Sequence, residues 1–234
     1  MKNQSETANT TPANLMALYI SGAILNVFNV AISAGILFLA AGQIDWPFAW
    51  IYIISYLIFR LVSLYISLRH IHWNEGKKPP LFDRILNIGY GLTHPFTLIL
   101  AGFEFNLTQS SQAFAATVQV VAFVFLILTF ALMLWAQWKN PYYFSNATTF
   151  QSEQKIVNIG PYQFIRHPGH AGLFMLAFAR PLILGSRLGF LPGIIGASII
   201  ILQTIREDHL LQQKSEDYKN YAEAVRYRVF SGIW

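Results

Sequence analysis

The feature that most constrains this sequence is a series of long stretches with almost no charged residues. A helix of about 20 apolar residues can cross the hydrocarbon core of a bilayer, which is about 30 Å thick. Charged residues make up 12% of the chain, against about 25% in soluble domains, so a soluble enzyme with a single buried core is excluded. We predict six membrane spans, at residues 15–41, 47–66, 85–105, 113–138, 171–184 and 188–205.

The last two predicted spans differ from the others. As a helix, residues 171–184 would measure roughly 21 Å, which is less than the hydrocarbon thickness. Gly185, Ser186 and Arg187 separate this span from the next, so we expect a short helical hairpin. Residues 206–225 are charged and carry apolar residues at helical spacing, which predicts a helix along the cytoplasmic face. The predicted fold is therefore an all-α, multi-pass integral membrane helical bundle.

The distribution of basic residues predicts the orientation of this bundle, because cytoplasmic loops collect Lys and Arg. With both termini and the second and fourth loops in the cytoplasm, all 16 Lys and Arg fall on that side except Arg60, Arg180 and Arg187. Arg60 lies within the second span, where a charge indicates a functional role unless it extends toward the inner surface. The net charge of +5 suits an anionic membrane surface better than nucleic acid.

The chain divides into three parts. Residues 1–14 are polar and lack the pattern of a signal peptide, so we expect a flexible tail. Residues 15–138 hold the first four spans. Residues 139–234 hold a long loop, the hairpin and the C-terminal helix. Cysteine is absent, which excludes a thiolate metal site and a cysteine nucleophile.

The strongest local motif is the segment 160–172, which ends where the fifth span begins. Pro168 is suited to the first position of a helix, where its missing N–H is no loss. The free N–H groups of that first turn, together with Arg166, would suit an anion such as a carboxylate. The alternative is an ordinary helix start, with Arg166 following the positive-inside rule and His167 at the membrane interface.

A second motif stands at the end of the sixth span, where Glu207 and Asp208 are followed by Tyr218 and Tyr221. Two adjacent carboxylates are unusual at the cytoplasmic edge of a membrane, which favours cations. They would accept hydrogen bonds from a ribose or an ammonium group. The alternative is a salt bridge to a nearby arginine on a solvated helix face.

The two motifs together resemble the isoprenylcysteine carboxyl methyltransferase and phospholipid methyltransferase superfamily of integral membrane enzymes. The resemblance covers about residues 139–234. It departs from the family at His170, where the family usually has Tyr, and at Asp208, where a second Glu is common. The residues that carry it are Gly160, Tyr162, Arg166, His167, Pro168, Gly172, Glu207, Asp208, Leu211, Tyr218 and Tyr221.

The resemblance implies that S-adenosylmethionine is the cofactor and that Arg166 and Glu207 act in catalysis. Arg166 would suit its carboxylate and Glu207 its ammonium or ribose, and no metal is expected. The resemblance also implies aromatic rings for the adenine and the sulfonium, namely Tyr142, Tyr143, Phe144, Tyr162 and Phe164. The expected cofactor-binding residues are Tyr162, Arg166, His167, Pro168, His170, Gly172, Glu207, Asp208, Tyr218 and Tyr221.

The implied activity is methylation of a lipophilic acceptor that reaches the site sideways from the bilayer, such as an isoprenoid, a prenylcysteine carboxylate or a phospholipid. The resemblance to bacterial members implies the bacterial inner membrane. The distribution of basic residues predicts that both termini are cytoplasmic and that nucleic acid is not a partner. One alternative is a sterol-type reductase, but NADPH would need several basic residues for its phosphate. Another is a non-catalytic membrane lipid-binding protein of the same fold.

Overall fold

The computed structural model describes residues 12–69, 80–108, 114–143 and 155–234, and this part of the chain is built from helices. Long apolar runs form the long helices, and turns or polar segments separate them. The helices are α1 (Pro12–Ala41), α2 (Pro47–Arg69), α3 (Leu81–Thr108), α4 (Ala116–Lys139), the short 3₁₀ helix η3 (Gly160–Gln163), α5 (Pro168–Ile183), α6 (Phe190–Lys214) and α7 (Glu216–Ala224).

Six of these helices correspond in order to the six predicted spans, and four are long and apolar enough to cross a membrane. These four are Met16–Ala41, Pro47–Arg69, Ala116–Lys139 and Phe190–Lys214. Helix α3 is as long but more polar, and α5 has 16 residues, which is about 24 Å. The helices thus fit an integral membrane protein, with four of the six predicted spans supported by length and composition.

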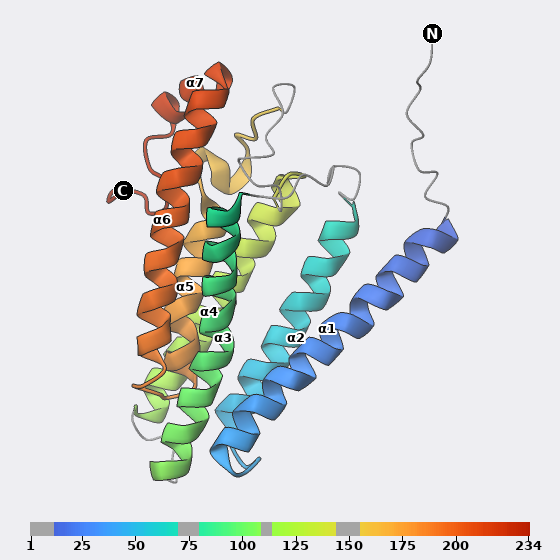
Figure 1. Cartoon of the computed structure of the whole chain (residues 1–234), viewed down its shortest axis with the longest axis vertical. Coiled ribbons are helices and arrows are strands. Elements are labelled where there is room, and N and C mark those ends of the chain that lie inside the picture. Colours follow the sequence, from blue (N-terminus) through green and yellow to red (C-terminus); the bar gives the residue numbers. More distant parts are fainter. Residues whose placement is uncertain (1–11, 70–79, 109–113, 144–154) are drawn as a thin grey trace.

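The long helices form a bundle that opens toward one end. Helix α5 packs between α4 and α6, and α3 packs on α6. Helices α1 and α2 lie side by side and lean away from α3 toward the end that carries η3 and α7, which we call the polar end (Figure 1). The buried core therefore lies toward the opposite end, and includes Leu37, Trp46, Leu98, Leu126 and Ile183.

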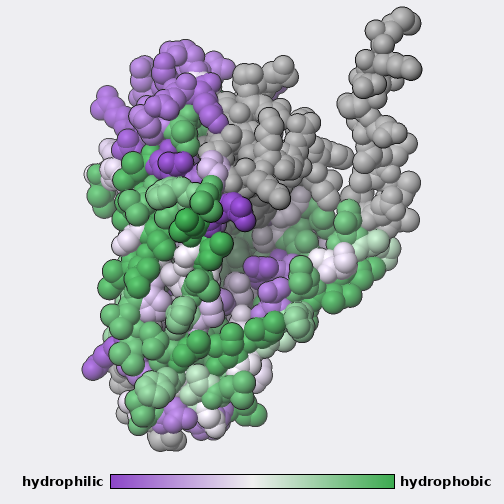
Figure 2. Space-filling view, in the orientation of Figure 1, coloured by the Kyte–Doolittle hydropathy of each residue, from purple (hydrophilic) through white to green (hydrophobic). Residues whose placement is uncertain are grey.

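The outer surface of the bundle is apolar, as a lipid environment requires. Large hydrophobic side chains are exposed on α1, α2, α3, α4 and α6, with Leu39 85% and Val121 63% exposed. Figure 2 shows this hydrophobic surface around the bundle and a hydrophilic surface over the polar end. The polar end is therefore the part of the described chain best suited to bind a water-soluble ligand.

The turn of the hairpin between α5 and α6 is built by Gly185. Its φ of 63° lies in the left-handed region, which glycine adopts without a steric cost. The Gly185 N–H donates to Leu182 O and the Ser186 N–H to Pro181 O, the hydrogen-bond pattern of a Schellman C-cap. Glu104 Oε2 on α3 accepts from Ser186 Oγ at 2.7 Å and from the Leu188 N–H at 2.9 Å. The hairpin is thus fixed to α3 at the end opposite the polar end.

The prediction of a single helix over residues 206–225 is wrong, because the helix is interrupted at Ser215. Helix α6 runs on to Lys214, and Ser215 then adopts an extended conformation with φ −143° and ψ 120°. Its Oγ accepts from the Tyr218 N–H at 3.2 Å and caps α7. The break redirects α7, so that Tyr218 and Tyr221 turn back toward the end of α6.

Candidate active site

The segment before α5 is shaped by one glycine and two prolines. Gly160 has a φ of 63°, and a Cβ there would lie 2.8 Å from Lys139 Cγ. Pro161 follows in η3, and His167 is the N-cap of α5. Pro168 is the first residue of that helix, which confirms the position predicted for it.

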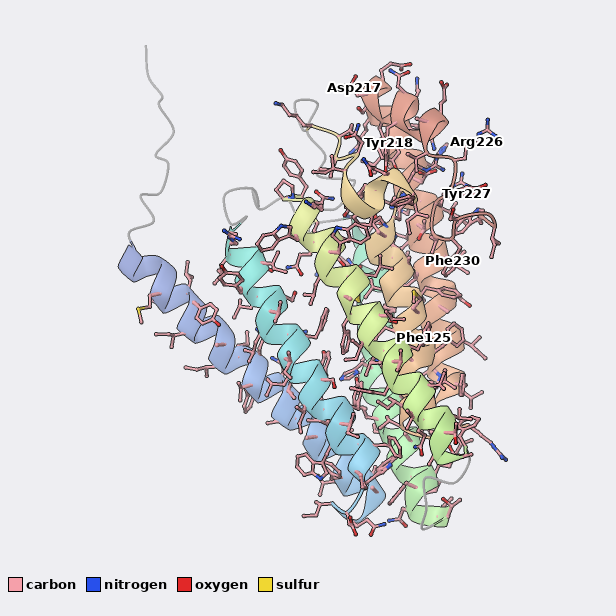
Figure 3. All side chains as sticks on the ribbon, turned by 180° about the vertical axis from the view of Figure 1, so that it is seen from behind. Phe125, Asp217, Tyr218, Arg226, Tyr227 and Phe230 are labelled. Carbon is pink, nitrogen blue, oxygen red and sulfur yellow. The ribbon has the colours of Figure 1, made fainter. Side chains whose placement is uncertain are left out.

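The C-terminal segment of the chain holds this motif in place from the other side. The Arg166 N–H donates to Tyr227 O at 2.9 Å, and the His167 N–H donates to Arg228 O at 2.8 Å. The hydroxyl of Tyr221 donates to the carbonyl of Tyr162 at 2.6 Å. Figure 3 shows Tyr218 on α7 and Tyr227 on the segment that follows it, both toward the polar end. The motif at the start of α5 therefore depends on residues about 60 positions later in the chain.

Asp208 lies at the centre of this polar end and is only 1% exposed. Arg166 approaches it with Nε 3.0 Å from Oδ1 and donates Nη2 to Oδ2 at 3.2 Å. Arg228 Nε, the Tyr218 hydroxyl and Gln212 Nε2 donate to the same carboxylate at 2.9, 3.0 and 2.8 Å. Because four side chains surround this carboxylate, Asp208 acts as an internal anchor for the walls of the site.

The same contacts occupy the guanidinium of Arg166, a residue that is 7% exposed. It forms an ion pair with Asp208, to which its Nη2 donates, and its Nη1 donates to Ala222 O at 3.0 Å. The salt bridge between the acidic pair and an arginine, considered above as an alternative, is thus present at Arg166. Arg206 instead pairs with Asp83, with 2.6 Å between Nε and Oδ1.

Tyr218 and His167 complete the contacts of Asp208. Burial and the neighbouring carboxylate raise the pKa of Tyr218 well above its usual value, so the phenol keeps its proton and donates it to Asp208. His167 Nε2 lies 3.2 Å from the Tyr218 hydroxyl and 3.4 Å from Asp208 Oδ1. Since the phenol has one proton to give, the contact with His167 requires the imidazole proton on Nε2.

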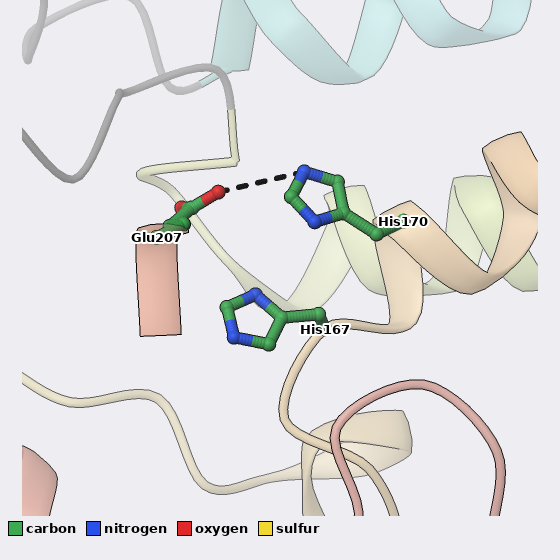
Figure 4. Close-up of side chains that lie close together, drawn as sticks. All are labelled: His167, His170 and Glu207. Carbon is green, nitrogen blue, oxygen red and sulfur yellow. Dashed lines mark ion pairs between the residues drawn. The ribbon is translucent and has the colours of Figure 1, made fainter. Parts of the chain in front are cut away.

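Glu207 lies beside His170 and His167 (Figure 4). Its Oε2 lies 3.4 Å from His170 Nε2, and the two side chains are 29% and 19% exposed. The rings of His167 and His170 stack with 5.4 Å between their centroids. One ligand atom from each of the three residues lies within 4.8 Å of the others, a spacing that would also admit a metal ion.

These side chains open onto a cavity of about 500 Å³, which is within the usual size range of small-molecule sites. Every residue predicted to bind the cofactor lines it except Gly172 and Asp208. Gly172 is buried behind the wall, where a Cβ would lie 2.2 Å from Met133 Cγ, so its role is to let α5 approach α4. The cavity joins the N-terminal end of α5, the C-terminal end of α6 and α7.

A comparison with known protein families found a match for the part of the chain that includes this cavity. Residues 116–216 match the phospholipid methyltransferase family. The resemblance to this superfamily is thus confirmed over a region that runs from α4 to the first residue of α7, and it indicates a membrane methyltransferase. No curated protein matches the chain. Helices α1 to α3 precede the matched region.

The aromatic residues expected around the cofactor divide into three groups. Tyr142, Tyr143 and Tyr162 line the cavity. Phe164 is 60% exposed and does not. Phe144 lies outside the described residues. Burial raises the pKa values of Tyr143 and Tyr162, so both phenols stay neutral.

Sequence reasoning missed several residues of the cavity wall. They are Asn87 on α3, Met133 on α4, Leu173 on α5, and Lys155, Ile156 and Val157 before η3. None stands in a motif, and helices α3 and α4 approach the site only through tertiary packing. A signal for these residues was therefore not available in the local sequence.

Proposed function

We propose that this protein is an S-adenosylmethionine-dependent methyltransferase that modifies a lipophilic acceptor at the membrane. One observation carries the proposal: the two halves of the family motif, Arg166 to His170 and Glu207 to Tyr221, meet around one cavity of about 500 Å³. The family match over residues 116–216 includes both the start of α5 and the end of α6.

The chemistry of the cavity suits the charges of S-adenosylmethionine. Glu207 offers a partly exposed carboxylate to its ammonium or sulfonium. The rings of Tyr142, Tyr143 and Tyr162 line the same space, and aromatic faces attract a sulfonium by about 0.5 to 2 kcal/mol. Lys155, which also lines the cavity, offers a cation to the carboxylate of the cofactor.

The contacts of Arg166 favour a positioning role for it. Because Asp208 occupies its guanidinium, Arg166 orders Tyr218 and the start of α5, while Glu207 is the acidic residue that contacts the ligand. In methyl transfer, a nucleophilic oxygen or nitrogen of the acceptor attacks the methyl carbon in line with the breaking carbon–sulfur bond, and the thioether leaves. Orientation supplies most of the catalysis in such a step.

The same contacts weigh against the reductase alternative. The phosphate of NADPH is bound by several basic side chains. Among the described residues that line the cavity, the permanently charged cations are Lys155 and Arg166, and Arg166 forms an ion pair with Asp208. The acceptor is proposed to be an isoprenoid, a prenylcysteine carboxylate or a phospholipid, because Met133, Leu173 and Leu211 give the cavity an apolar side.

Calorimetric titration of the purified protein with S-adenosylmethionine tests the proposal. Breaking a charge-assisted hydrogen bond costs about 1.5 to 3 kcal/mol, or about 10- to 150-fold in affinity. Glu207→Gln should therefore weaken cofactor binding by that factor. Glu223→Gln changes an exposed carboxylate on α7 and should leave the affinity unchanged.

A chelator separates this proposal from the metal site that His167, His170 and Glu207 would admit. We expect EDTA to leave the affinity for S-adenosylmethionine unchanged. Equal affinity of the Glu207 and Glu223 variants, or binding that disappears with EDTA, would contradict the proposed site.

A further inference from the structure

A second polar group of residues lies deeper in the bundle, outside the candidate active site. We call it the intramembrane cluster, and define it as Tyr52, Tyr56, Arg60, Tyr90, His94 and Arg180. Its members come from α2, α3 and α5, with Arg180 in the last turn of α5. Charged residues within a membrane bundle are costly and usually mark a site for a substrate or an ion.

Arg180 is the most deeply placed charge of this cluster. It is 5% exposed, and its Nε has no hydrogen-bond partner. The phenols of Tyr52 and Tyr90 are its polar neighbours. Among the described residues no carboxylate forms an ion pair with it, so the guanidinium is buried without a counter-charge.

The hydroxyl protons of these phenols are directed toward neutral groups and not toward a charged partner. The Tyr90 hydroxyl donates to Leu173 O at 3.0 Å. Ser33 Oγ donates to the carbonyl of Asn29 at 2.9 Å, so its 3.1 Å contact with His94 requires the imidazole proton on Nε2. His94 Nδ1 then accepts from Tyr52. Both hydroxyls therefore donate to neutral groups and supply no counter-charge to Arg180.

Arg60 on α2 adds a second cation to the cluster. Its Nε donates to Asn26 Oδ1 at 2.7 Å, and its guanidinium lies 5.9 Å from the centroid of the Tyr56 ring. Both contacts are with neutral groups, and no ion pair to Arg60 is present in the described part of the chain. The Tyr56 ring in turn lies 5.2 Å from the ring of His94, and His94 contacts the hydroxyl of Tyr52 at 3.4 Å, so neutral rings link the surroundings of Arg60 to those of Arg180.

The cluster is accessible from the side of the bundle. Figure 2 shows hydrophilic surface in the hollow between α1 and α3, with hydrophobic surface on both sides of it. Tyr56, Arg60, Tyr90 and His94 are each partly exposed. Tyr90 also connects the cluster to the active-site cavity, because it bonds the carbonyl of Leu173, which lines that cavity.

We propose that the intramembrane cluster binds the oxyanion head group of an amphiphile, a carboxylate or a phosphate, that enters from the bilayer between α1 and α3. The cluster has two cations without a carboxylate partner, and it lies in an apolar bundle with a lateral opening. These properties favour an anionic amphiphile over a neutral ligand. If the protein methylates a lipid as proposed above, this amphiphile is the methyl acceptor or contains the acceptor group. Binding of the amphiphile does not depend on that activity.

Native mass spectrometry of the full chain in an uncharged detergent tests this proposal with four probes. Oleate and lysophosphatidic acid carry an oxyanion and an acyl chain, methyl oleate carries the chain alone, and inorganic phosphate carries the anion alone. We expect the first two probes to bind and the last two to remain unbound. Arg60→Gln and Arg180→Gln should each lower the affinity by about tenfold or more.

Arg84→Gln is the matched control, since Arg84 is an exposed arginine at the start of α3 and its loss should leave binding unchanged. If Arg180→Gln fails to fold, Arg60→Gln carries the test, because its side chain is partly exposed. Methyl oleate binding as tightly as oleate, or Arg60 and Arg180 variants that bind like the Arg84 variant, would overturn the proposal. Titration of the same wild-type sample with S-adenosylmethionine separates the two proposals, since a failure to bind the cofactor contradicts the proposed function alone.

Discussion

Glu207 and Asp208 are adjacent in the chain and have opposite environments. Consecutive residues of an α-helix point about 100° apart, so one carboxylate faces the cavity while the other faces Arg166, Arg228 and Tyr218. The exposed fractions of the two side chains, 29% and 1%, reflect this division. Glu207 is therefore available to a ligand, and Asp208 stabilises the site that holds it.

Asp208→Asn tests this structural role. The substitution removes the negative charge between Arg166 and Arg228, and leaving a buried charge without its partner costs about 3 to 5 kcal/mol. We expect the free energy of unfolding in detergent to fall by roughly this amount. Asp217→Asn, at an exposed position on α7, should change it by less than about 0.5 kcal/mol. Equal stability of the two variants would show that Asp208 does not anchor the polar end.

The sequence predicted some of these residues and not others, for physical reasons. The position of Pro168 follows from proline chemistry, and the grouping of Glu207 with the start of α5 followed from the family resemblance. The pairing of Arg166 with Asp208 depends on the rotational phase of α6 and on Arg228, which approaches from the end of the chain. Neither is encoded in a local pattern, so Arg166 was assigned to the cofactor carboxylate.

At the scale of the helices, the distance between α5 and α6 sets the geometry of the site, because His170 and Glu207 lie on these two helices. Gly193 on α6 faces the backbone of α5, where a Cβ would lie 2.6 Å from Ala177 O. A backbone oxygen within a helix cannot move aside as a side chain does. The absence of a side chain at Gly193 therefore permits the close packing of the hairpin.

Gly193→Ala should separate the hairpin and weaken the site. Overpacking of this kind costs about 1 to 3 kcal/mol of unfolding free energy, and we expect lower affinity for S-adenosylmethionine as α6 shifts. Gly91→Ala is the control, since a Cβ at Gly91 meets nothing within 4 Å and alanine stabilises a helix interior by about 0.5 to 1 kcal/mol. Thermal unfolding and calorimetry measure both effects. A Gly193 variant as stable as the Gly91 variant would argue against the close approach.

The order of the helices was predictable because hydrophobicity and length decide it. The break at Ser215 was not, because residues on both sides of it are good helix formers and the cap of α7 competes with continuation of α6. The break is what allows Tyr218 to reach Asp208. The interruption of the helix at Ser215 thus determines part of the cavity wall.

On the scale of the whole molecule, two polar regions are embedded in an otherwise apolar bundle. The active-site cavity is lined by residues of the polar end, and the members of the intramembrane cluster lie on α2, α3 and α5. Tyr90 links them through Leu173. This arrangement suits an enzyme that takes a soluble cofactor from one side and a lipid from within the membrane.

The most direct test of the account is transfer of a tritiated methyl group from S-adenosylmethionine to lipid. The purified protein is incubated in vesicles made from the total lipids of the cells that produce it, and label in the organic extract is counted. We expect label with the wild type and with Glu223→Gln, and a large loss with Glu207→Gln. Cofactor binding without any label in the lipid fraction would contradict the account.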